Sequence, residues 1–509
     1  MAIGPNKPRV IYSANARIWL NELDGTTGSR TLAGIPEKRL TRLREFGIDL
    51  FWPIGIWPTG PKSTKVARNH AGLQEEYRRV LPDFAQEDVG GSPYAIATYT
   101  VDTALGGASA LAEFRAKLRR NGIGLILDFV VNHTGLDHPW LMERPDLYVQ
   151  GTAEDAEQAP DSFFTVDTLH GLRVIAHGRD PYFPSWTDTA QLNLFNPETR
   201  QVLSAELERL AGQCDGLRCD MAMLALSSIY RQTWASQRSA TVESHSPDEE
   251  FWPAAIAAVH RRYPEFLFIA EVYWGLEDAL RQVGFQYTYD KTLYDRLVHG
   301  NAEGLRVHLR ADVGWQTGCV RFIETHDELP AAVPLPWDRH KAAAMLIATV
   351  PGLTLIHDGQ IEGHVNRIPI QLCRRGAERP NRMVLEFYQA LLQMLAADKV
   401  VRRGNWSLLP ARSAWSENPT WAHFVVYFWG SQGEQLRLVI VNFAETQGQC
   451  YVDLSPMRLN PAHREFEFSD QFTMGNKAVY RYSAEQLLRD GLYVDLPPFG
   501  FHFFEVSPP

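Results

Sequence analysis

Short apolar runs alternate with amphipathic segments from about residue 9 to residue 395. This alternation is typical of repeated strand–helix units. Residues 122–131 are almost continuously apolar, which predicts a strand buried on both faces, as in a parallel sheet. Just before them, the spacing of Leu111, Phe114 and Leu118 predicts a helix over 108–121. We therefore expect an α/β fold with parallel strands.

Seven further apolar runs predict strands of the same kind. The eight expected strands lie at 10–14, 48–54, 122–131, 216–220, 266–271, 285–290, 320–324 and 353–357. Eight strands with intervening helices favour a (β/α)8 TIM barrel. The Pro- and Gly-marked connection after the third strand is too long for a plain loop, so it predicts an inserted subdomain.

After about residue 404 the pattern changes to short alternating runs, at 422–428, 436–443, 449–454 and 499–506. Such runs are typical of an antiparallel β-sandwich. A chain of 509 residues is also long for one core. We expect a catalytic barrel of residues 1–131 and 190–403, an inserted subdomain of residues 132–189, and a C-terminal β-sandwich domain of residues 404–509.

The composition indicates which kinds of binding partner and which cellular compartment to expect. A net charge of −10 argues against a nucleic-acid partner, which would require a basic face. No run approaches the roughly 20 apolar residues that span a bilayer, and MAIGPNKPRV offers no signal-peptide core. The five cysteines are few and lack metal-ligand spacing. These features predict a cytoplasmic protein with free thiols and no membrane partner; they leave the oligomeric state open.

Four predicted strands end in acidic or imidazole side chains. They are GLILDFVVNH (124–133), GLRCD (216–220), FIAEVYW (268–274) and FIETHD (322–327). Carboxylates at the ends of apolar strands are costly unless these ends open into a shared, partly wet cleft. The carboxyl ends of parallel barrel strands all face one side. The four segments therefore predict one active site.

The residue types within these segments suit acid–base and nucleophilic chemistry. Arg218 and Asp220 are two apart and face the same way on a strand, where the arginine would keep a nucleophilic carboxylate ionised. A structural ion pair inside a barrel explains this spacing equally well. Glu271 precedes Tyr273 and Trp274, and aromatic surroundings raise a carboxyl pKa towards that of a general acid.

A pairing such as that of His326 with Asp327 also occurs in metal sites and catalytic triads. The sequence has no nearby His, Cys or Asp cluster with ligand spacing and no Gly-x-Ser-x-Gly elbow. A metal site and a catalytic triad therefore both fit this pair poorly.

The four segments resemble the conserved regions of the α-amylase family, glycoside hydrolase family 13. Those regions run Asp-x-x-x-Asn-His, Gly-x-Arg-x-Asp, Glu at a strand end, and His-Asp, in this order. The matching residues are Asp128, Asn132, His133, Gly216, Arg218, Asp220, Glu271, His326 and Asp327. Residues 189–193 (TAQLN) resemble a further short region of the family. The expected barrel, insertion and C-terminal β-domain also match the family's layout.

The resemblance implies a retaining double displacement, with Asp220 as nucleophile, Glu271 as acid/base and Asp327 as transition-state stabiliser. The implied substrate is an oligosaccharide or disaccharide with α-glucosidic bonds. Its implied binding residues are Tyr94, Asp128, His133, Arg218 and His326. We predict no cofactor and no metal site. Asn132 matches a calcium-ligating position of many members, which allows calcium without predicting it.

Three departures from the family pattern leave the substrate open. Ala95 follows Tyr94 where several exo-acting α-glucosidases carry an Asp that grips the terminal glucose. Residues 221–224 (MAML) replace the Lys-His of many α-amylases, and residues 357–372 lack the common Tyr-Gly-Glu-Glu pattern. In that last segment, Gln360 and Glu362 with Arg367 either shape the sugar site or pack against the C-terminal domain.

The sequence therefore predicts a glycosidase that hydrolyses α-glucans, maltooligosaccharides or related α-glucosides. Transglycosylation by the same residues is the alternative. A catalytically silent carbohydrate-binding or scaffold protein is a hypothesis from another class. Silent relatives typically lack one or more of the carboxylates, whereas Asp220, Glu271 and Asp327 are all present.

Overall fold

The computed structural model describes residues 10–27, 29–234, 249–430, 435–460, 462–472 and 478–508. Eight parallel strands close into a barrel and follow one another around the ring in chain order, which confirms the predicted architecture. The strands are β1 (Val10–Asn15), β2 (Leu50–Ile54), β3 (Gly124–Val130), β8 (Gly216–Asp220), β9 (Leu267–Ala270), β10 (Tyr287–Tyr289), β11 (Cys319–Arg321) and β12 (Leu353–His357). Each predicted barrel strand overlaps one of them.

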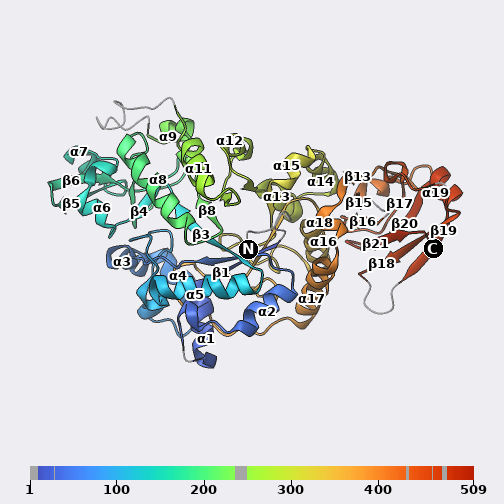
Figure 1. Ribbon diagram of the computed structural model, residues 1–509, viewed down its shortest axis with the longest axis horizontal. Helices are drawn as coiled ribbons and strands as arrows, with labels where there is room; N and C mark the ends of the chain where they lie inside the picture. Colours follow the sequence, from blue (N-terminus) through green and yellow to red (C-terminus); the bar gives the residue numbers. More distant parts are fainter. Residues whose placement is uncertain are drawn as a thin grey trace.

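Helices follow each barrel strand and cover the outside of the ring (Figure 1). They are α1 (Ala16–Thr27), α2 (Glu37–Glu45), α3 (Pro61–Asn69), α4 (Ala71–Val80), α5 (Gly107–Arg120), α8 (Pro197–Ala211), α9 (Ser227–Trp234), α11 (Phe251–Arg262), α12 (Glu277–Gln282), α13 (Lys291–His299), α14 (Ala302–Leu309), α15 (Val313–Thr317), α16 (Trp337–Thr349), α17 (Arg382–Ala397) and α18 (Val400–Arg403). Within the described ranges, no helix is both long and apolar enough to cross a membrane.

The barrel strands are buried on both faces because helices cover the outside and side chains fill the inside. All seven residues of β3 are buried. Phe129 points outward, where its ring packs against Tyr99 and Trp252. Its neighbour Asp128 points inward and lies opposite Arg218 in the β3–β8 ladder. Strand alternation therefore places charged groups inside the ring while apolar residues hold the strand against the helix layer.

The connection between β3 and α8 forms the inserted subdomain. Its elements are β4 (His133–Gly135), α6 (Pro139–Glu143), α7 (Ala153–Gln158), β5 (Phe163–Thr168), β6 (Gly171–Ala176) and β7 (Thr189–Gln191). Strands β4 and β7 pair antiparallel, with His133 opposite Gln191, so the excursion leaves and returns at the same place. The β5–β6 hairpin lies at the end of the molecule far from the C-terminal domain (Figure 1).

The C-terminal domain contains two antiparallel sheets, as predicted, with a separate apolar core. One sheet has the order β13 (Asn405–Leu408), β15 (Phe424–Gly430), β16 (Leu436–Asn442), β21 (Phe501–Ser507), β18 (Glu465–Asp470), β19 (Val479–Ser483). The other has the order β14 (Ala411–Ser413), β17 (Gly448–Val452), β20 (Leu492–Leu496), and α19 (Ala484–Asp490) joins β19 to β20. Trp429 fixes the domain to the barrel, because its Nε1 donates to the carbonyl of Thr349 at 2.7 Å.

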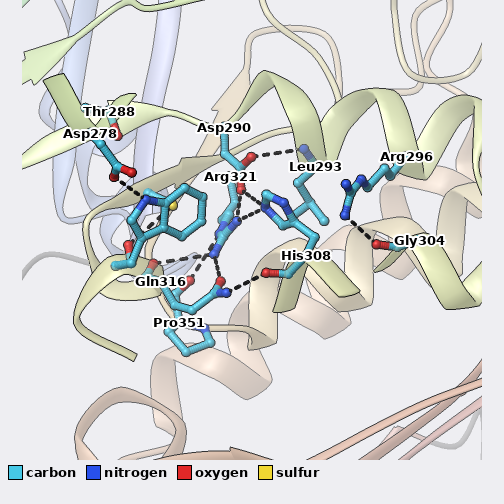
Figure 2. Close-up of polar contacts among 12 residues, drawn as sticks. Asp278, Thr288, Asp290, Leu293, Arg296, Gly304, His308, Gln316, Arg321 and Pro351 are labelled. Atoms are coloured by element: carbon cyan, nitrogen blue, oxygen red, sulfur yellow. Dashed lines mark hydrogen bonds and ion pairs between the residues drawn. The ribbon is translucent and has the colours of Figure 1, made fainter. Parts of the chain in front are cut away.

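A buried ion pair joins β10 to β11 on the helix side of the barrel. The guanidinium of Arg321 lies between Asp290, His308 and Gln316 (Figure 2). His308 Nε2 is 2.8 Å from Asp290 Oδ2, and burial lowers the pKa of His308 to about 4. Arg321 therefore carries the positive charge that balances Asp290. Tyr289, the residue before Asp290, faces the barrel interior. The Asp290–Arg321 pair therefore also fixes a side chain of the barrel core.

We expect Asp290→Asn to lower the free energy of unfolding by about 3–5 kcal/mol, because it leaves the Arg321 guanidinium buried without a counter-ion. The amide oxygen of asparagine can still accept the hydrogen bond from Leu293 N–H that caps α13. The loss of stability therefore measures the removal of the negative charge. The measurement is the urea unfolding transition. Asp295→Asn is the matched control, since Asp295 forms a partly exposed pair with Lys291 and should cost less than about 1 kcal/mol. Equal effects of the two substitutions would contradict the assignment of Asp290 as the counter-ion of Arg321.

Candidate active site

One guanidinium joins three of the predicted site carboxyl groups. Arg218 Nη1 donates to Asp220 Oδ1 at 2.6 Å and lies 3.5 Å from Asp128 Oδ1, and its Nη2 lies 2.8 Å from Glu271 Oε1. The Arg218 side chain is 1% exposed. The three acids come from β3, from β8 and from the residue that follows β9, which are neighbours in the ring. The predicted Arg218–Asp220 pair is therefore part of a larger charge cluster.

Aromatic rings surround this guanidinium. The rings of Trp52, Tyr94 and Tyr289 have their centroids 5.1, 5.0 and 5.8 Å from Arg218 Cζ. Trp52 also donates from Nε1 to Asp128 Oδ2 at 3.0 Å. Burial raises the pKa of Asp128 to about 7, although Arg218 opposes that shift. The rings exclude water from the cluster, and lower local polarity strengthens the interactions between its charges.

Glu271 is held by two donors besides Arg218. The backbone N–H of Met221 donates to Oε2 at 2.7 Å, and the Tyr273 hydroxyl donates to Oε1 at 3.0 Å. Burial raises the pKa of Glu271 to about 8, with Arg218 opposing the shift and Asp220 adding to it. The raised pKa favours the protonated form of this carboxyl group, the direction that the aromatic residues near it in the sequence indicated.

Met221 adopts a left-handed backbone conformation, with φ of 41°. A non-glycine residue in this region costs about 1–3 kcal/mol and persists only where its surroundings determine it. Here the buried turn Ala222–Ala225 follows, and Ala222 N–H donates to the carbonyl of Glu271 at 3.1 Å. Residues 221–224, which depart from the family pattern, therefore position Glu271.

His326 links Tyr94 to Asp327. Its Nε2 is 2.8 Å from the Tyr94 hydroxyl and 3.1 Å from Asp327 Oδ2. Burial lowers the pKa of His326 to about 3, so its ring is neutral. His133 packs its ring on Trp186 at a centroid distance of 5.1 Å, and burial lowers its pKa to about 4. Both histidines therefore offer neutral rings next to the carboxylates.

One detail of the predicted strand ends is wrong. Strand β11 ends at Arg321, so His326 and Asp327 lie in the loop that follows it. The Thr325 hydroxyl accepts from the N–H groups of Asp327 and Glu328, at 3.2 and 3.3 Å, and this turn draws the backbone away from the sheet. The loop leaves the Asp327 side chain 47% exposed.

A cleft of about 480 Å³ opens above the charge cluster. Tyr94, His133, Asp220, Glu271 and Asp327 all line it. Arg218 contacts Asp220, and His326 contacts Tyr94. Asp128 joins them through Arg218, at 3.5 Å. The structure therefore brings all eight predicted site residues together. It adds Trp52, Tyr273 and Tyr289, which contact the charge cluster and were not among the predicted site residues.

The unusual segment after β12 contacts the loop that carries Asp327 and the helix layer of the barrel. Arg367 Nη1 donates to the carbonyl of Asp327 at 3.2 Å, which places Arg367 beside the cleft. Gln360 is buried, and its Nε2 donates to the Tyr388 hydroxyl on α17 at 2.8 Å. Gln360 therefore packs within the helix layer of the barrel and away from the C-terminal sheets.

At the calcium-related position, two side-chain amides hydrogen-bond to each other. Asn132 Nδ2 donates to Gln191 Oε1 at 3.1 Å, and Gln191 Nε2 donates to Asn132 Oδ1 at 3.0 Å. The amide oxygen that a cation would need already accepts an N–H group. Over the described ranges, no three His, Cys, Asp or Glu side chains are grouped so that they could hold a metal ion.

Comparison with known proteins agrees with this geometry. Residues 24–299, more than half of the chain, match the family model for the α-amylase catalytic domain. Alpha-amylase MalA of Haloarcula japonica is 23% identical over 282 residues, which are 53% of this chain and 36% of that protein. The alpha-1,4-glucan:maltose-1-phosphate maltosyltransferase of Rhodospirillum rubrum is 25% identical over 49% of this chain and 30% of its own. The chain thus spans about a third of the length of these relatives.

Among solved structures, the maltogenic alpha-amylase AmyB from Thermotoga neapolitana superimposes with a TM-score of 0.68. The match covers 98% of this chain and 99% of that one at 19% identity. At this identity the likeness shows a shared fold.

We expect Arg218→Met to destabilise the protein by about 3–5 kcal/mol at pH 8 and by less at pH 5. Without the cation, the folded-state pKa values of Asp128 and Glu271 rise further above their unfolded values. A carboxyl group whose pKa is raised by folding adds stability below the unfolded pKa, and that stability is lost as pH rises through the folded pKa. The deficit should therefore grow with pH in urea unfolding experiments.

The matched control is Arg382→Met, because Arg382 lies on α17, is 89% exposed and pairs only with Glu386 among the described residues. It should cost less than about 1 kcal/mol at both pH values. A deficit of Arg218→Met that stays constant from pH 5 to pH 8 would disprove the shared-cation explanation.

Proposed function

Since the chain belongs to the α-amylase family, we propose that it is a retaining enzyme acting on α-glucosidic bonds by double displacement. The proposed substrates are α-glucans, maltooligosaccharides or related α-glucosides. The observation that carries this proposal is the environment of Asp220 and Glu271. One guanidinium contacts both, and burial together with the charge of Asp220 raises the pKa of Glu271. A retaining glycosidase requires such neighbouring carboxyl groups, one as nucleophile and one as acid.

In the first proposed step, Asp220 attacks the anomeric carbon of the bound sugar. Arg218 holds Oδ1, which leaves Oδ2 to form the new bond. The glycosidic C–O bond breaks as Glu271 transfers its proton to the leaving oxygen. Positive charge develops on the sugar ring, and the partly exposed carboxylate of Asp327 stabilises it.

In the second step, the Glu271 carboxylate removes a proton from a water molecule. That water attacks the anomeric carbon, the ester to Asp220 breaks, and the product keeps its original configuration. The neutral ring of His133 and the Tyr94 hydroxyl, which line the cleft, bind the sugar hydroxyls next to the cleaved bond, and His326 positions Tyr94 and Asp327. These steps use side chains of the chain alone.

Transglycosylation is a second candidate because an exposed aromatic pair lies beyond the acid. Tyr182 and Trp274 are 58% and 37% exposed, and their ring centroids are 4.7 Å apart. Trp274 follows Glu271 by three residues. An acceptor sugar stacked on these faces would compete with water for the intermediate. Products from maltotriose distinguish the candidates, since transfer gives chains longer than the substrate and hydrolysis gives only shorter ones.

We also propose a cytoplasmic location. All five cysteines are free thiols and four of them are buried. Reduced cysteines suit a compartment in which glutathione keeps thiols from oxidising.

We expect Asp220→Asn to reduce turnover of maltooligosaccharides by at least about a thousandfold, because the covalent intermediate cannot form. Glu271→Gln should lose about 10²–10⁴-fold, as expected for a general acid. Reducing-sugar release is the measurement, with trehalose and sucrose as further substrates. The control is Glu265→Gln, an exposed glutamate just before β9. Unchanged turnover in Asp220→Asn would refute its proposed role.

We expect kcat/KM for maltose to fall above about pH 8, because Glu271 then loses the proton that it must donate. A 4-nitrophenol leaving group departs without this proton. The Glu271→Gln variant should therefore release it from 4-nitrophenyl α-glucoside with no decline in rate above pH 8. A wild-type rate for maltose that stays constant to pH 9.5 would exclude Glu271 as the acid.

A further inference from the structure

One wall of the cleft lies outside the predicted site. Helices α3 and α4 and the segment before β7 form it, and we call it the far wall. Its lining residues are Val66, Ala67, His70, Leu73 and Asp188. Three of these are apolar, while His70 and Asp188 can form hydrogen bonds. The proposed catalytic steps do not use any of them.

Asp188 is held in place through its backbone, and its carboxylate accepts a hydrogen bond from its own backbone N–H. Its own carbonyl accepts from the Ser63 hydroxyl at 2.7 Å, and Thr189 N–H closes a turn onto the carbonyl of Trp186 at 3.0 Å. In the part of the chain that the structure describes, no other side chain bonds to its carboxylate oxygens. Burial raises the pKa of Asp188 to about 6. A half-buried acceptor held in this way is available to a ligand.

His70 provides a donor on the same wall. Its Nδ1 accepts from the N–H of Leu73 at 3.2 Å, which caps the start of α4. In the neutral ring the proton must then be on Nε2, which is free to donate. The far wall therefore presents one fixed acceptor and one fixed donor beside an apolar surface, an arrangement that suits neighbouring hydroxyls and the C–H face of a sugar.

The topology indicates which sugar reaches this wall. Helices α3 and α4 belong to the β2–β3 connection, which also carries Tyr94. Glu271 follows β9, which is three strands further around the ring. The leaving group lies beside Glu271, because it receives that proton. A sugar extending past Tyr94 towards α4 therefore belongs to the glycone, the part that becomes attached to Asp220.

We propose that His70 and Asp188 bind the hydroxyl groups of the second glucosyl unit on the glycone side of the cleaved bond. This inference rests on the proposed function. Binding at the far wall makes the enzyme select substrates with at least two sugar units on the glycone side of the cleaved bond.

The test compares kcat/KM for aryl release from 4-nitrophenyl α-maltoside with that from 4-nitrophenyl α-glucoside. Only the maltoside places a second glucosyl unit against the far wall. Asp188→Asn should lower the maltoside-to-glucoside ratio by about tenfold, because the neutral amide oxygen is a weaker acceptor than the carboxylate and the amide group adds a competing donor. His70→Asn keeps an N-cap residue but removes the imidazole donor, so the ratio should fall by about threefold.

The matched control is Asp167→Asn, which changes an exposed carboxylate on β5 of the same subdomain. It should leave the ratio at its wild-type value. An unchanged ratio in Asp188→Asn would overturn the proposal. An equal loss for both substrates would also overturn it, because Asp188 would then act on the reacting sugar or on the fold.

Calorimetric binding of maltotriose separates failure of this inference from failure of the proposed function. We expect Asp188→Asn to raise the dissociation constant for maltotriose by about tenfold, whether or not the enzyme cleaves the bond. Absence of aryl release from either substrate by the wild type, together with this weaker binding, would refute the proposed activity and support the sugar-binding wall. Unchanged maltotriose binding in Asp188→Asn would refute the wall.

Discussion

The buried guanidinium of Arg218 is the interaction on which the rest of the site depends. Three carboxyl groups converge inside the barrel where β3, β8 and β9 meet, and burying them together without a cation would cost about 3–5 kcal/mol. Arg218 contacts all three while aromatic rings exclude water around it. Barrel closure is what makes this arrangement available, because it sets neighbouring strands in register with their inward residues at one level.

The sequence was sufficient for those features that depend on neighbours along the chain. Apolar runs located all eight barrel strands, and strand alternation placed Arg218 beside Asp220. The contacts of Trp52 and Tyr289 could not be found in this way, because each sits in an apolar strand and looks like an ordinary core residue. Met221 gave no local signal either, since its left-handed conformation is imposed by the buried turn after it and by Glu271.

Other features depend on how separate excursions meet above the barrel. His70 and Asp188 are 118 positions apart and lie in two polar connections, which the sequence marks only as departures from the strand–helix pattern. The hydrogen bond from Ser63 to the Asp188 carbonyl brings these connections together. The Asn132–Gln191 amide pair likewise closes the base of the insertion with polar groups that a metal ion would otherwise bind.

The contacts around Glu271 also allow its acidity to change during the reaction. The negative charge of Asp220 is one of the causes that raise the pKa of Glu271. In the proposed glycosyl-enzyme intermediate, Asp220 is an uncharged ester, so this contribution disappears. Arg218 then has one charged partner fewer and stabilises the Glu271 carboxylate more strongly. Formation of the ester thereby converts the group that has just donated a proton into one that accepts it, through electrostatic feedback that requires no backbone motion.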